Sequence, residues 1–285
     1  MPRRAFTVAV ILALAGLAAC GDSAPSKEDF LAKADPVCAR GNAIATVFTT
    51  PSDLPMIKDF ATKLADNADK TAAEVEKLDF PGGDDGKAAK DMVKSLRDAG
   101  VAARAVIPDV DASNYPNVET GVTKMVDAFK AADGKARTFG SKECGKGEAE
   151  AVGKLGITAN ATVKNAYIAK ADALCEAADK QIDALPEPDS PAEAKESIDK
   201  SGVILDKMLA DIIAIPKPHT DSTKLTEYIS STERFIAKFK EGGAIAVSAN
   251  ERKFEQWVEE LSELGDAADA KADAFGFKGC GSQGA

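Results

Sequence analysis

The feature that most constrains this chain is an internal repeat. The segment Phe30–Cys38 returns as Tyr167–Cys175, with five of nine positions identical. A second matching pair, Phe139–Gly145 and Phe275–Gly281, follows at nearly the same offset. Because self-similarity at a fixed offset is the signature of repeated architecture, we expect two copies of one structural unit in tandem.

The apolar residues of each unit recur at steps of three and four, which is the period of an amphipathic helix. No stretch shows the sustained alternation with β-branched residues that predicts a strand. In the first unit the pattern predicts helices at residues 27–48, 55–78, 84–107 and 117–139. In the second unit the apolar stripes cover residues 167–185, 198–213, 225–239 and 254–275. Four helices with short connections predict an all-α fold of two tandem up-down-up-down four-helix bundles.

Several positions interrupt this pattern. Pro36 lacks a backbone donor, so the first helix should either kink there or restart with Asp35 as its cap. The continuous apolar face of this helix favours the kink. Residues 108–116 are expected to form a loop, and Gly242-Gly243 should weaken the third helix of the second unit. Residues 147–161 contain scattered glycines and are expected to connect the bundles, either as a helix or as a flexible linker. The two predicted bundles are therefore residues 27–146 and residues 162–285.

The N-terminus has the features of an export signal. Arg3 and Arg4 precede a short apolar run that ends at Ala19 and is too brief to span a bilayer as a mature helix. The sequence Leu17-Ala18-Ala19-Cys20 resembles the bacterial lipobox; the alternative is an ordinary signal peptide with a chance cysteine. The resemblance implies that residues 1–19 are removed, that Cys20 carries lipid, and that residues 20–26 form a tether. The double unit is also similar in general form to bacterial lipoproteins built from helical repeats.

The chain has five cysteines, and setting Cys20 aside leaves two in each unit. Four cysteines allow three pairings. The repeat favours Cys38–Cys144 and Cys175–Cys280, because each duplicated unit should carry its own disulfide. An exported protein can keep such bonds oxidised, and free buried thiols are the alternative.

The charge of the chain is acidic. The formal net charge is −10, and removal of residues 1–19 with their two arginines makes it −12. This balance argues against a nucleic-acid partner and against a polybasic grip on anionic lipid. No second apolar run is long enough to cross a membrane, so attachment would depend on the N-terminal lipid. We therefore expect an extracytoplasmic protein anchored to the cell membrane.

Few residues offer chemistry. His219 is the single histidine, and although Asp221 could orient it, no positioned nucleophile accompanies them, so a loop role is expected. One histidine is too few for a di-iron bundle site, which uses paired Glu-x-x-His motifs. Residues 79–91 fail as a calcium loop because Pro81 falls at a ligand position. No metal, cofactor or catalytic residue is predicted.

Other candidates have structural explanations. The triplets Lys33–Asp35 and Lys170–Asp172 recur in both units, and a solvated face of the first helix would account for them. Phe254 and Trp257 lie on the inward stripe of the last helix and are expected in the core.

These observations favour a non-catalytic binding or scaffold protein of the cell envelope. A second hypothesis is a carrier of an apolar small molecule or lipid, held between helices or between bundles. The alanine-rich stripes disfavour it, because small inward residues let helices approach closely. A third hypothesis is a carboxylate-based hydrolase, which needs two acids in one cleft with divergent pKa values. An envelope protein or an apolar ligand remains the expected partner besides the membrane.

Overall fold

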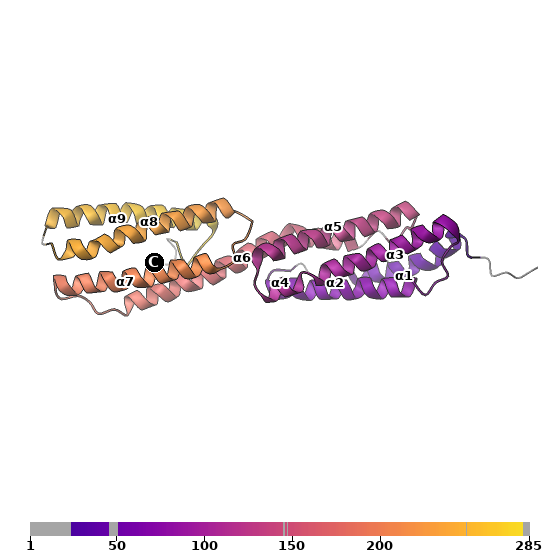
Figure 1. Cartoon of the computed structure of the whole chain (residues 1–285), viewed down its shortest axis with the longest axis horizontal. Helices are drawn as coiled ribbons and strands as arrows, with labels where there is room; N and C mark the ends of the chain where they lie inside the picture. Colours follow the sequence, from indigo (N-terminus) through magenta and orange to yellow (C-terminus); the bar gives the residue numbers. More distant parts are fainter. Residues whose placement is uncertain (1–23, 46–50, 145, 147, 249, 282–285) are drawn as a thin grey trace, which may run out of the picture.

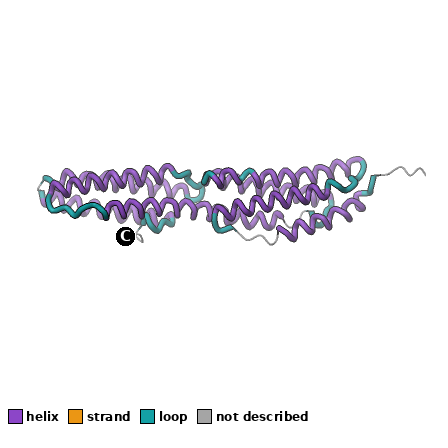
Figure 2. Tube along the Cα trace, turned by 90° about the horizontal axis from the view of Figure 1, so that it is seen from below, coloured by secondary structure: helices purple, strands orange, loops and turns teal. Residues whose placement is uncertain are grey.

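A computed structural model describes residues 24–45, 51–144, 146, 148–248 and 250–281. Within these ranges all regular structure is helical, and two bundles lie end to end in an elongated rod (Figures 1 and 2). The all-α prediction is confirmed. The helices are α1 (Lys27–Ala45), α2 (Leu54–Val75), α3 (Gly83–Arg104), α4 (Ile107–Asp111), α5 (Tyr115–Phe139), α6 (Glu148–Asp183), α7 (Pro191–Ala214), α8 (Ser222–Ala246) and α9 (Glu251–Phe275).

Helix α6 belongs to both bundles. It has 36 residues and is therefore about 54 Å long. Its first half packs on α5 and buries Val152, Leu155 and Ala159, and its second half begins the second bundle. From Glu148 onward, the segment expected as a connector is thus part of a packed helix. One apolar cluster consequently runs from Leu54 in α2 through α6 into the second bundle.

Helix α1 continues through Pro36 as one helix and does not restart there, and the kink expected at this position stays a prediction. Other local details differ from the sequence expectations. The short α4 forms inside the segment expected as a loop. Helix α8 runs through Gly242. The glycine is required there by packing, because a Cβ would lie 2.2 Å from Cζ2 of Trp257. Trp257 is buried as expected, but the prediction for Phe254 is wrong: this side chain is 43% exposed.

Each unit is closed by the expected disulfide. Cys38 pairs with Cys144 and Cys175 with Cys280, with Cα–Cα distances of 4.8 and 5.2 Å. The chain turns back toward the first helix of its unit at a left-handed glycine, which has φ of 97° in the first unit and 109° in the second. The glycines that make these turns are Gly140 and Gly276.

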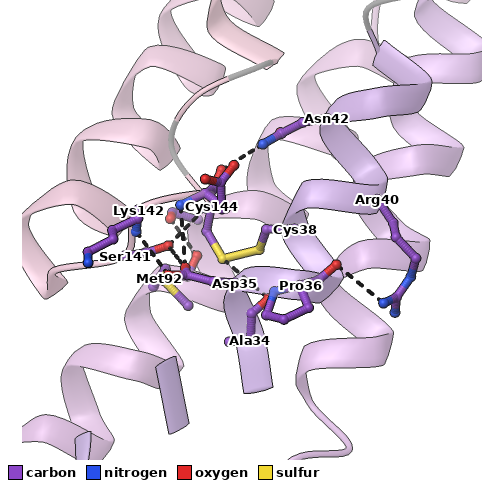
Figure 3. Close-up of a disulfide and its surroundings, with 12 residues drawn as sticks. Ala34, Asp35, Pro36, Cys38, Arg40, Asn42, Met92, Ser141, Lys142 and Cys144 are labelled. Carbon is purple, nitrogen blue, oxygen red and sulfur yellow. Dashed lines mark hydrogen bonds between the residues drawn. A yellow bond between two sulfur atoms is a disulfide. The ribbon is translucent and has the colours of Figure 1, made fainter. Parts of the chain in front are cut away.

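The recurring aspartates hold the loops that carry the second cysteines. Asp35 accepts hydrogen bonds from the Ser141 hydroxyl and from the backbone N–H of Lys142 (Figure 3). Asp172 accepts hydrogen bonds from the backbone N–H groups of Lys278 and Cys280, at 3.1 and 3.2 Å. The expected solvated face therefore fits the exposed lysines but not the aspartates, which tie each unit together beside its disulfide.

A buried carboxylate links the two bundles at their junction, in addition to the continuous helix α6. Glu119, on α5, accepts hydrogen bonds from the backbone N–H of His219 at 2.6 Å and from the Thr220 hydroxyl at 2.9 Å. His219 thus lies in a loop, and that loop contacts the first bundle. Nearby, the rings of Tyr115 and Tyr167 pack edge to face across the junction, with centroids 6.0 Å apart.

Candidate functional site

The second bundle is not evenly closed. Helix α6 packs on α7, α7 on α8 and α8 on α9, whereas α6 and α9, which would complete the ring, make few close approaches. The Cys175–Cys280 disulfide joins α6 to the segment that follows α9. The bundle therefore contains a cleft that begins at this disulfide.

The cleft has a volume of about 500 Å³ and is bordered by all four helices and by the loop around Cys280. Apolar side chains from α6, α7, α8 and α9 make up part of its lining, and we call this part the floor. The side chains that form the floor are Ile182, Leu205, Met208, Phe235, Ile236 and Ala268.

The sequence of α9 explains part of this space. Gly265 and Ala268 border the cleft, and a Cβ at Gly265 would only reach van der Waals contact with the Phe235 ring, at 3.5 Å. Small residues allow helices to approach only if the partner helix moves in. Because α6 stays apart from α9, these positions leave room instead of contact.

Three carboxylates border the cleft from opposite sides. Asp179 and Asp183 lie one turn apart on α6, and Asp269 lies on α9. Within the described ranges, none of the three makes a hydrogen bond or salt bridge, and no lysine, arginine or histidine borders the cleft. Burial is the largest cause that raises the pKa of Asp179 and of Asp269 above the ordinary value, and neighbouring carboxylates raise it further.

Tyr228 also borders the cleft. Its side chain is 2% exposed, and its hydroxyl is 4.0 Å from the Cys175 sulfur. Burial raises the pKa of Tyr228 to about 12, and the charges of Asp179 and Asp269 contribute to the shift. The phenol therefore stays neutral at physiological pH, and the cleft has an aromatic residue without a charge in its lining.

The repeat contains a signal for Asp269 that the sequence analysis missed. Residues 131–140 and 267–276 share the pattern Ala-Ala-Asp-x-Lys-Ala-x-x-Phe-Gly, which is seven of ten positions. The counterpart of Asp269 in the first unit is the buried Asp133. The counterpart of Asp179 is Asn42, which donates a hydrogen bond of 2.7 Å to the carbonyl of Glu143 (Figure 3). The two units therefore differ at this wall: an amide tied to the loop in one, an unpaired carboxylate in the other.

The other expected site residues are placed as follows. Cys20 and the signal segment lie outside the described residues. Within the described part of the chain, no set of three or more potential ligands is grouped for a metal ion, and no helix has the length and apolar character needed to cross a membrane. Comparisons with protein-family models, curated proteins and solved structures find no match to this chain.

Proposed function

We propose that this chain is a lipid-anchored extracytoplasmic binding protein that holds a small, largely apolar ligand in the cleft of its second bundle. The observation that carries the proposal is the cleft itself. Ligand sites are commonly concave, mainly apolar and between 300 and about 1,000 Å³, and a cleft of about 500 Å³ with an apolar floor fits that description.

The rod suits an anchored receptor. Helix α1, which follows the proposed lipidated tether, begins at the end of the rod remote from the second bundle (Figure 1). The first bundle contains α5, whose 25 residues span about 37 Å. With Cys20 lipidated, the first bundle would act as a spacer, and the cleft would stand at least that far from the anchored end. The two disulfides support an oxidising compartment.

The acids of the cleft favour binding over hydrolysis. Catalysis by two carboxylates needs environments that push their pKa values apart, so that one donates and the other accepts a proton. Burial instead raises the pKa of both Asp179 and Asp269. When the pKa values of two carboxyl groups shift in the same direction for the same reason, neither group is set apart as the proton donor or the proton acceptor.

The test uses a variant that fills the cleft without weakening the helix. Gly265→Leu adds a side chain at the border of the cleft. Replacing a glycine in a helix interior by a better helix former stabilises the helix by up to about 1 kcal/mol. We expect wild-type protein to bind the neutral dye Nile red saturably at one site and Gly265→Leu to lose that binding. Gly134→Leu is the matched control, because a Cβ there meets nothing within 4 Å. Unchanged dye binding by Gly265→Leu would refute the proposal.

A further inference from the structure

We propose that the ligand of this cleft is an amphiphilic cation, with an ammonium head group between Asp179 and Asp269 and an apolar tail along the floor. This inference rests on the proposed function and specifies the chemistry of its ligand. It combines three independent properties of one cavity: unpaired carboxylates at the border, aromatic walls, and an apolar floor.

The first argument is that the carboxylates have no partner of their own. Some other carboxylates of the chain have one: Asp221 is paired with Lys164 at 2.7 Å, and Asp172 accepts backbone hydrogen bonds. Asp269 is half-buried, and burial also raises the pKa of Asp179, although Asp179 and Asp183 lie at exposed positions on the border. None of the three receives either kind of compensation in the described structure. Shielding a charge without compensation is costly, and an opposite charge within a few ångströms restores the balance.

The second argument concerns the aromatic walls. Tyr228 and Phe235 both border the cleft, so a cation there would also meet aromatic rings. Ring faces attract ammonium groups and are a known means of holding quaternary ammonium ligands. The chain itself places an ammonium group this way, since Lys164 Nζ lies 4.8 Å from the centre of the Phe275 ring.

The third argument is exclusion. An anionic amphiphile such as a fatty acid would bring its carboxylate next to three others, with no basic residue among the described neighbours. A neutral amphiphile would contact the floor but would give the carboxylates no charged partner. The floor thus provides affinity for any apolar tail, whereas the border discriminates by charge.

The test measures displacement of Nile red by three ligands with the same tail: decyltrimethylammonium, decanol and decanoate, each below its micelle-forming concentration and at low salt. We expect the cation to bind about ten-fold more tightly than the alcohol, and decanoate to bind most weakly. Choline, which carries the head group without the tail, should compete poorly.

Two double variants identify the responsible charges. Asp179→Asn/Asp269→Asn should bind decanol normally but lose the preference for the cation. Glu176→Gln/Asp266→Asn is the matched control: it removes the same charge from the same two helices at exposed positions outside the cleft lining, and should keep the preference. Equal binding of cation and alcohol by the wild type, or a preference that survives in Asp179→Asn/Asp269→Asn, would overturn the inference while the proposed function stands. Absence of Nile red binding would overturn both.

Discussion

The contact between Gly242 and Trp257 offers a test of how closely α8 and α9 pack. The indole ring lies over Gly242, and a Cβ added there would be 2.2 Å from Cζ2 and 2.7 Å from Cε2. Ordinary carbon–carbon contacts are about 3.5–4.0 Å. Because the ring would have to move by more than an ångström, Gly242→Ala cannot be accommodated by a small adjustment.

The size of the effect follows from three contributions. Overpacking a well-packed core costs about 1–3 kcal/mol. Moving the ring also breaks the hydrogen bond that Trp257 Nε1 donates to the carbonyl of Lys238 at 2.8 Å, which is worth about 0.5–1.5 kcal/mol. Replacing glycine by alanine in a helix returns about 1 kcal/mol. We therefore expect Gly242→Ala to lower the free energy of unfolding by about 0.5–3.5 kcal/mol.

Two measurements check this expectation. Urea unfolding gives the change in stability. Fluorescence reports the ring directly, because Trp257 is the only tryptophan of the chain, and its emission should shift to the red as the ring becomes exposed. Gly134→Ala is the matched control and should gain up to about 1 kcal/mol, because its new Cβ meets no neighbour within 4 Å. If Gly242→Ala were as stable as Gly134→Ala, with unshifted emission, the described packing of α8 on α9 would be wrong.

Three further outcomes can be measured. Cys20→Ala should move the protein from the membrane fraction to the soluble fraction, and retention in the membrane fraction would contradict lipidation. Replacing Cys175 and Cys280 by serine should lower the free energy of unfolding by about 4–5 kcal/mol, because the bond closes a loop of 105 residues; a loss below about 1 kcal/mol in denaturant titrations would contradict this. Since burial raises the pKa of Asp179 and Asp269, their contribution to the stability of the unliganded protein is present below about pH 4 and is lost as the pH rises through the raised values. Asp179→Asn/Asp269→Asn should therefore be more stable than wild type at neutral pH and should lack this part of the pH dependence in urea titrations, and a less stable double variant would refute the stated cause of the shifts.

The repeat and the helical period were sufficient to predict both disulfides and the long helices apart from the first half of α6, but not the short α4. Periodicity records which face of a helix is buried, and duplication restricts the pairing of cysteines to one choice per unit. The role of Asp35 and Asp172 was not predictable in this way, because their partners are backbone groups more than 100 residues away. Glu119 was missed for the same reason: its partners lie in a loop of the other bundle.

The continuity of α6 shows where propensity arguments fail. Its first half contains glycines and few large apolar residues, so the sequence left a flexible linker open as an alternative. The structure buries Val152, Leu155 and Ala159 against the first bundle, and this tertiary contact outweighs the weak local preference for a helix.

The cleft depends on helix placement, which the inward stripes do not encode. In the first bundle, the first half of α6 packs closely along α5. In the described part of the second bundle, no helix takes the corresponding place along α9, the counterpart of α5. The same inward alanines that suggested a solid core therefore border a space in the second unit. Duplication followed by unequal covering would thus give a packed spacer and an open receptor from one helical plan, and the exchange of Asn42 for Asp179 would add charge selectivity to the open copy.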